Sequence, residues 1–191
     1  MADVGVLYGP PGVGKNAATL RLAERLAARG LRVGGFFQRA VADDPDRRSY
    51  DLVRFADRSE AIALARPGVQ RDEAAESCVC SLVFSRAALA KGLAWLRADA
   101  AWADVLVIDE ISKLEVAGDG HYETVRWALA LPPAMLLLLS VRADQLVYAV
   151  EKFDLADRIR GDLELPASDE QLEELAQRLI RVRGQPLDYA G

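Results

Sequence analysis

A glycine-rich segment near the amino end has the composition and spacing of a phosphate-binding loop. Residues 9–16 read GPPGVGKN, which places three glycines before Lys15. Glycines let the main chain curl so that several N–H groups point at one anion, and a helix that starts there adds its own N–H groups and dipole. Lys15 supplies a positive charge that can reach the β- and γ-phosphates of a nucleoside triphosphate. The residues expected to bind the phosphates are Gly9, Pro10, Pro11, Gly12, Val13, Gly14, Lys15, Asn16 and Ala17.

Asn16 departs from the usual pattern, which has serine or threonine after the lysine. The usual hydroxyl gives one oxygen to Mg²⁺, an ion that takes oxygen ligands in strict octahedral geometry. An Asn amide oxygen can also coordinate, but the side chain is larger and projects further. We therefore expect Asn16 to belong to the metal site, directly or through water, with weakened turnover as the consequence.

An acidic pair follows an apolar segment in the second half of the chain. Val105–Ile108 reads as a buried strand, and Asp109 and Glu110 come directly after it. Parallel strands of an open α/β sheet end at the ligand crevice, so both carboxylates are expected near the phosphates. Asp109 would hold the Mg²⁺ shell, and Glu110 would orient an attacking water or accept its proton. The alternative is a pair of solvated acids at a strand end.

Phosphoryl transfer often uses a second cation on the γ-phosphate. Arg142, after an apolar segment, and Arg160, within an Ile-Arg pair, are the candidates, with Arg158 a weaker one. Each is also compatible with an ordinary surface arginine. The lone histidine, His121, is expected at a helix start on the surface.

The elements that would position these residues follow from the hydrophobic pattern. Val4–Tyr8 is an apolar run typical of a buried strand, and Ala18, Leu22 and Leu26 recur at helical spacing until Gly30. Further strands are expected at Val33–Phe37, Ser49–Phe55, Val79–Phe84, Val105–Ile108, Met135–Val141 and Leu163–Leu165, while Ala61–Leu64 fits a strand or a helix. Helices are expected from Ser85 to Ala98, at His121–Leu131, at Ala143–Glu151, and from a capping box at Ser168–Gln171 to Gly184. Residues 41–48 and 67–76 read as loops.

This alternation predicts one α/β domain over residues 1–191, with a doubly wound, mainly parallel sheet and helices on both faces. A net charge of −5 argues against a broad nucleic-acid surface. Cys78 and Cys80 are expected to be small apolar residues on one face of a strand, with a redox or metal role as the alternative. The chain shows no signal pattern and no apolar run long enough for a bilayer, so we expect a cytoplasmic protein.

Three segments together resemble one known family. GPPGVGKN at 9–16, VGGFF at 33–37 and VIDEISKLE at 107–115 are similar to motifs of small nucleoside-triphosphatases described from thermophiles, with a relative known as cancer-related nucleoside-triphosphatase. The resemblance covers most of residues 3–165. It implies a RecA-like P-loop fold and Mg²⁺-dependent hydrolysis of ATP, GTP and other triphosphates to the diphosphate and phosphate, with broad base tolerance.

The family pattern extends beyond the acidic pair. Lys113 and Glu115 match its lysine and glutamate, whereas Ser112 replaces a glycine. Asn16 replaces the family's threonine, and Gln38 stands where a threonine is common.

Three functions are compatible with these residues. The leading one is a nucleoside-triphosphate phosphohydrolase. Asn16 favours a second, a nucleotide-binding switch or cofactor-assembly accessory protein with weak or no hydrolysis. A third is a small-molecule or nucleoside kinase. Such kinases usually have an arginine-rich lid that closes over the phosphate donor, and ADRIRGD at 156–162 is a weak candidate for one. The sequence is also compatible with a protein partner, whose identity it does not indicate.

Overall fold

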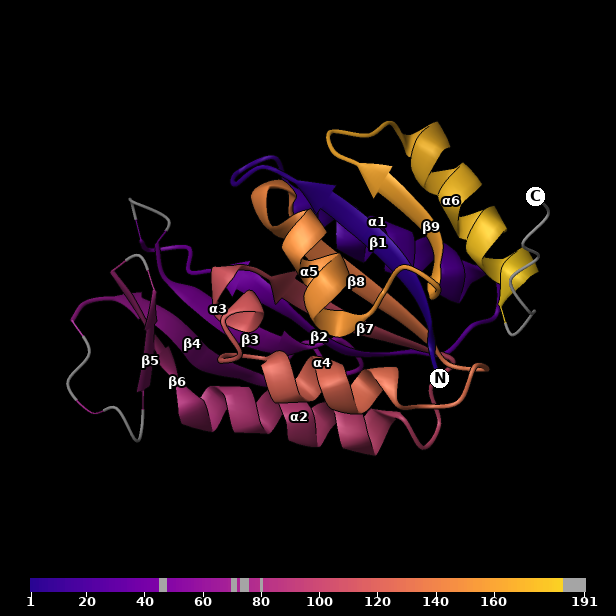
Figure 1. The fold of residues 1–191 in the computed structure, drawn as a ribbon. Coiled ribbons are helices and arrows are strands. Elements are labelled where there is room, and N and C mark those ends of the chain that lie inside the picture. The colour runs from indigo at the N-terminus through magenta and orange to yellow at the C-terminus, as the bar shows by residue number, and fades with distance from the viewer. Residues whose placement is uncertain (45–47, 70–71, 73–75, 80, 184–191) are drawn as a thin grey trace.

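The computed structural model describes residues 1–44, 48–69, 72, 76–79 and 81–183. The described part forms a sheet in the order β5-β6-β4-β3-β2-β7-β8-β1-β9 (Figure 1). Its strands are β1 (Asp3–Gly9), β2 (Val33–Ala40), β3 (Tyr50–Arg54), β4 (Ala61–Pro67), β5 (Glu76–Val79), β6 (Leu82–Ser85), β7 (Val105–Ile111), β8 (Leu136–Arg142) and β9 (Ile159–Glu164). Its helices are α1 (Lys15–Ala28), α2 (Arg86–Asp99), α3 (Lys113–Val116), α4 (Tyr122–Leu129), η1 (Ala143–Gln145), α5 (Leu146–Phe153) and α6 (Asp169–Val182).

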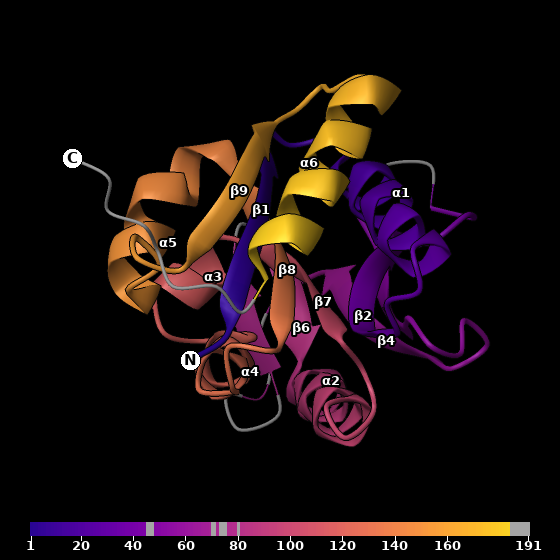
Figure 2. The same cartoon turned by 90° about the vertical axis from the view of Figure 1, so that its right-hand side faces the viewer.

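Five neighbouring strands, β2, β7, β8, β1 and β9, run parallel, and β3, β4, β6 and β5 extend the sheet as antiparallel strands. Helices α1 and α6 cover one face, and α2, α4 and α5 cover the other (Figure 2). The central strands are apolar on both sides because both faces are covered. This confirms the predicted mainly parallel α/β fold with helices on both faces. None of the described helices has the length and apolar character needed to cross a bilayer.

Most predicted elements are present, including the strand at 61–64 that the pattern left ambiguous and the helices capped by Ser85 and Ser168. The strand predicted at 79–84 was wrong, because this stretch contains a hairpin between β5 and β6 in which Val79 pairs with Leu82. Ser81 adopts a left-handed φ of 60°, which lets the chain reverse inside an apolar run. Cys78 lies in β5 and is exposed, which corrects its expected apolar packing; Cys80 lies outside the described residues.

A buried acid holds β2 close to its neighbours. The side chain of Asp99, at the end of α2, is fully buried, accepts a 2.9 Å hydrogen bond from the Gly35 amide and forms an ion pair with Arg54 of β3. Gly35 has a φ of 96°, and a Cβ there would lie 2.2 Å from the carbonyl oxygen of Val107 in β7. Only glycine allows this approach, which brings β2 and β7 close together at the Gly35–Val107 pair.

Removing the carboxylate of Asp99 should therefore lower stability strongly. We expect Asp99→Ala to reduce the free energy of unfolding by about 3 kcal/mol, because it leaves the Gly35 amide and Arg54 without their buried partner. Urea unfolding followed by circular dichroism measures the change. The matched control is Glu24→Ala, which breaks an exposed ion pair with Arg58 and should cost less than about 1 kcal/mol. Equal effects of the two variants would contradict this account of Asp99.

Candidate active site

The glycine-rich segment forms the turn between β1 and α1, as the pattern predicts. β1 ends at Gly9 and α1 begins at Lys15. Gly12 and Gly14 have φ values of 79° and 90°, in the left-handed region that favours glycine. The loop thus curls over the first turn of α1, where unpaired N–H groups and the helix dipole favour an anion.

Lys15 is nearly buried beneath this loop and links it to the acidic pair. Its Nζ donates to the carbonyl oxygens of Pro10 and Gly9, at 3.1 and 3.3 Å. The same atom lies 3.7 Å from a carboxylate oxygen of Glu110. The structure therefore brings together the predicted phosphate-binding lysine and the predicted catalytic carboxylate, which are far apart in the sequence.

Asp109 is fully buried at the end of β7 and is held on both sides. One carboxylate oxygen accepts a hydrogen bond from the Ser140 hydroxyl of β8, and the other accepts one from the Gln38 amide of β2, at 3.1 Å. Burial raises the pKa of Asp109, while these two hydrogen bonds and the Lys15 charge act in the opposite direction. The carboxylate is thereby fixed between three neighbouring parallel strands.

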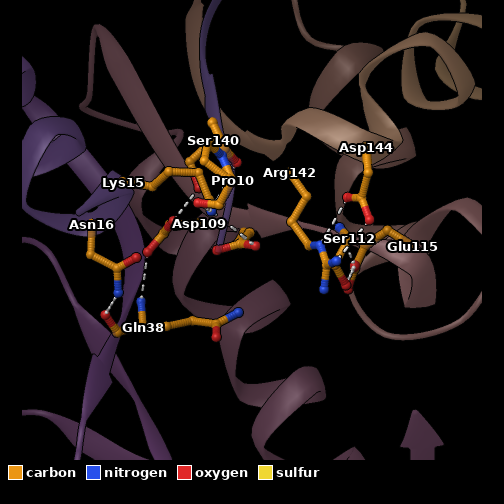
Figure 3. A network of polar contacts seen from close by, with 12 residues as sticks. Pro10, Lys15, Asn16, Gln38, Asp109, Ser112, Glu115, Ser140, Arg142 and Asp144 are labelled. Carbon is orange, nitrogen blue, oxygen red and sulfur yellow. Dashed lines mark hydrogen bonds and ion pairs between the residues drawn. The ribbon is translucent and has the colours of Figure 1, made fainter. Parts of the chain in front are cut away.

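Asn16 reaches the same place from the first turn of α1. Its amide nitrogen donates to the Gln38 carbonyl oxygen, so the main chain of Gln38 contacts both Asn16 and Asp109. The amide oxygen of Asn16 points toward Asp109 in Figure 3. The two predicted metal ligands therefore lie side by side, although one of them departs from the usual residue type.

Glu110 faces a cavity and remains partly accessible, with 22% of its side chain exposed. Burial raises the pKa of Glu110 to about 7, and the neighbouring Asp109 carboxylate adds to this rise, while Lys15 and Arg142 oppose it. A carboxylate with a pKa near neutrality can take up and release a proton during a reaction.

The cavity has a volume of ≈ 330 Å³, at the lower end of the range for small-molecule sites. Its lining comes from the phosphate loop, from the ends of β2, β7 and β8, and from the antiparallel strands. The lining residues are Pro11, Gly12, Gly14, Lys15, Asn16, Gln38, Tyr50, Leu82, Phe84, Glu110, Ser112, Lys113, Glu115 and Arg142.

A short helix just after the acidic pair fixes one wall of this cavity. Ser112 and Glu115 form a capping box around the start of α3, and the buried Glu115 carboxylate also accepts a 3.1 Å hydrogen bond from the His121 amide. Lys113 lies at the first position of α3 and lines the cavity. Helix α3 was not predicted, although the Ser-Lys-Leu-Glu spacing is a capping-box signature that identifies such a helix start.

The three arginines have different positions. Arg142 lines the cavity, and its guanidinium makes two hydrogen bonds with the Asp144 carboxylate, at 2.8 and 3.0 Å. Arg160 lies at the start of β9 and pairs with Asp3 at the start of β1, so it is not brought to the cavity. Arg158 lies nearby and donates to the Leu129 carbonyl oxygen. The two arginines of the Ile-Arg segment therefore do not contribute to the site, and ADRIRGD forms no lid over it.

A protein-family model described as NTPase matches residues 5–160, a range that contains both the phosphate loop and the acidic pair. The chain belongs to this NTPase family.

Individual relatives agree with this assignment. The human cancer-related nucleoside-triphosphatase is 31% identical over 137 residues, which cover 69% of this chain and 71% of the relative. The nucleoside-triphosphatase THEP1 of Methanocaldococcus jannaschii is 29% identical over 119 residues, covering 62% of this chain and 67% of the relative. The predicted family is thus confirmed, and the names of these relatives support nucleoside-triphosphatase activity.

Solved structures show the same fold. The solution structure of a human cancer-related nucleoside triphosphatase superposes with a TM-score of 0.67 at 24% identity, covering 94% of this chain and 96% of the other. The crystal structure of THEP1 from Aquifex aeolicus gives 0.66 at 18% identity, covering 95% and 99%. Both confirm the predicted P-loop NTPase fold class.

The oxygen donors of this chain fit a Mg²⁺ ion that would be shared with a substrate phosphate. Asp109 and Asn16 offer oxygen ligands next to the phosphate loop. Among the described residues, no group of three or more histidine, cysteine or acidic side chains could hold a metal ion alone. Mg²⁺ typically keeps several waters and uses one or two protein ligands plus substrate phosphates, which matches this donor set.

His121 differs from its expected surface position. It does precede α4, but its side chain is 1% exposed, and its ring centroid lies 4.6 Å from that of Phe36. Within the described residues, neither ring nitrogen has a hydrogen-bond partner. Burial lowers the pKa of His121 to about 3, so the folded protein holds this ring neutral.

This burial gives a pH-dependent stability of defined sign. Below the unfolded-state pKa of 6.5, the unfolded chain binds a proton at His121 that the folded chain rejects, so stability falls as pH decreases toward 3. When the pH falls from neutrality to about 5, the free energy of unfolding should decrease in the wild type. The decrease in His121→Phe should be smaller by about 2 kcal/mol. Urea unfolding at both pH values measures this difference. Parallel losses in the two proteins would show that His121 is not a source of acid sensitivity.

Proposed function

We propose that this protein hydrolyses nucleoside triphosphates to the diphosphate and phosphate with the aid of Mg²⁺. The observation that carries the proposal is the 3.7 Å approach of Lys15 Nζ to Glu110, directly beneath the glycine-rich loop. A cation for the outer phosphates and a carboxylate able to act on water line the same cavity.

Each residue has a separate task in this proposal. The amides of the loop and of the first turn of α1 bind the phosphates, and Lys15 neutralises charge on the β- and γ-phosphates. Glu110 orients a water for attack on the γ-phosphorus and accepts its proton as the bond to the leaving diphosphate breaks. Arg142, which lines the same cavity, adds positive charge. Asp109 and Asn16 would hold Mg²⁺, which neutralises charge on the phosphate oxygens when it is bound.

We further propose broad base tolerance, because the phosphate-binding groups identified above contact the phosphates and not the base. Phosphate release from ATP, GTP, CTP and UTP, with Mg²⁺ or with excess EDTA, tests both points. We expect the four rates to agree within about tenfold and to collapse on metal removal. Full activity in EDTA would contradict the metal assignment.

Asn16 provides a sharper test of the metal site. We expect Asn16→Thr to lower the Mg²⁺ concentration that gives half-maximal phosphate release by about tenfold, since a hydroxyl replaces a larger amide as ligand. Asn16→Ala controls for the loss of the contact with Gln38 and should not show the gain. An unchanged Mg²⁺ requirement in Asn16→Thr would show that Asn16 does not weaken the site.

The hydrogen bond from Asn16 to the Gln38 carbonyl oxygen engages the side chain that would serve the metal. It therefore also favours a second candidate, a nucleotide-binding switch with weak or no hydrolysis. Tight ATP binding without Mg²⁺ and without phosphate release would support that function against the first.

A further inference from the structure

The contact between Lys15 and Glu110 indicates the orientation in which a triphosphate would bind along the loop. In loops of this kind the amides hold the α- and β-phosphates, and the lysine reaches the β- and γ-phosphates. Because Lys15 Nζ points to Glu110, the γ-phosphate end lies toward Glu110 and the nucleoside lies on the other side. The part of the cavity beyond Glu110 is therefore on the γ-phosphate side, from which an in-line nucleophile would approach.

That part of the cavity is walled by the antiparallel strands. Tyr50 comes from β3, and Leu82 and Phe84 come from β6, all on the far side of β2 from the phosphate loop. In Figure 1 these strands and the loop after β1 lie at the same end of the molecule. Lys113, an exposed cation, lines the same cavity.

A water nucleophile requires little of this space. One water occupies roughly 30 Å³, and it gains nothing from aromatic or aliphatic walls. The aromatic ring of Tyr50 and the side chains of Leu82 and Phe84 give this part of the cavity an apolar wall on the γ-phosphate side inferred above. They are suited to a molecule with an apolar body, and Lys113 is suited to an anionic group on it.

We propose that this compartment, lined by Tyr50, Leu82, Phe84 and Lys113, binds a phosphoryl acceptor: a small alcohol with an apolar ring and one anionic group. The proposal rests on the phosphate site proposed above. The acceptor oxygen forms a bond to the γ-phosphorus while the bond from that phosphorus to the β–γ bridging oxygen breaks. The nucleoside diphosphate leaves with the electron pair, the hydroxyl proton passes to Glu110, and the products are a phosphate monoester and the diphosphate.

Competition between alcohols and water tests the proposal in the full chain. With γ-labelled ATP and Mg²⁺, the ratio of labelled ester to labelled inorganic phosphate is measured for 4-(hydroxymethyl)benzoate, benzyl alcohol and methanol at equal concentration. The ring should raise the ratio for benzyl alcohol about tenfold or more above that for methanol, and the carboxylate should raise it further. Each ratio comes from one reaction, so a variant's overall rate does not affect it.

Variants assign the preference to the compartment. Phe84→Ala should lower the ester-to-phosphate ratio for benzyl alcohol toward the ratio for methanol. Leu82→Ser provides an independent test of the same point if Phe84→Ala is unstable. Lys113→Gln should reduce the ratio for 4-(hydroxymethyl)benzoate and leave that for benzyl alcohol unchanged.

Three results would overturn the inference. Equal ratios for all three alcohols, with continued phosphate release, would remove the acceptor site and leave the hydrolase intact. A higher KM for ATP in Phe84→Ala, with an unchanged KM for inorganic tripolyphosphate, would mean that the compartment holds the base. Absence of both ester and phosphate would refute the hydrolase and the acceptor site together.

Discussion

Replacing Lys15 by alanine is expected to lower kcat/KM for ATP by at least about 10²-fold, the effect of removing one preorganised charge from a transition state. Lys15 Nζ contacts two loop carbonyl oxygens and lies 3.7 Å from Glu110, which places its charge at the base of the proposed phosphate site. Phosphate release under subsaturating ATP measures the loss.

The control for this variant is Lys91→Ala, which removes an exposed lysine of α2 remote from the loop. It should keep wild-type activity. Thermal unfolding of both variants establishes that they are folded. Wild-type activity in Lys15→Ala would contradict the assignment of the loop as the phosphate site.

Replacing Glu110 by glutamine should separate binding from hydrolysis. The amide keeps the shape of the side chain but cannot accept the proton of an attacking water, so kcat should fall by about 10²- to 10⁴-fold. ATP affinity should stay equal or increase, because the carboxylate repels the γ-phosphate. Phosphate release and calorimetric titration with ATP measure the two quantities.

Glu123→Gln, a change of the same type at an exposed position of α4, is the matched control. Normal turnover in Glu110→Gln would remove Glu110 from its proposed role. A parallel loss of ATP binding would mean that its carboxylate supports the structure of the site instead.

The parts of the site predictable from sequence are those carried by contiguous segments. The phosphate loop follows from the spacing of glycines before Lys15, and the acidic pair follows from an apolar strand that ends in Asp109 and Glu110. Parallel strands end at one edge of the sheet, so the meeting of these two segments could also be predicted.

The contacts that complete the site depend on strand order, which no local pattern specifies. Ser140 and the main chain of Gln38 hold Asp109 only because β8 and β2 flank β7. Ser140 did carry a signal, as the polar residue inside an apolar strand. Phe84 carried none, because its place in the cavity follows from the hairpin between β5 and β6, where a single strand was predicted.

The candidacy of Arg160 failed for a geometric reason. The last strand was expected at Leu163–Leu165, which would leave Arg160 in a preceding loop. Instead β9 begins at Ile159 and runs parallel to β1, so its first residues lie at the end of the sheet opposite the ligand crevice. There Arg160 forms an ion pair with Asp3.

The most direct test of the central claim is a crystal structure with Mg²⁺ and a non-hydrolysable ATP analogue. We expect the phosphates to lie in the loop of residues 9–16, with the γ-phosphate in contact with Lys15 Nζ and next to the Glu110 carboxylate. Phosphates bound outside the loop, or a γ-phosphate directed away from Glu110, would contradict it.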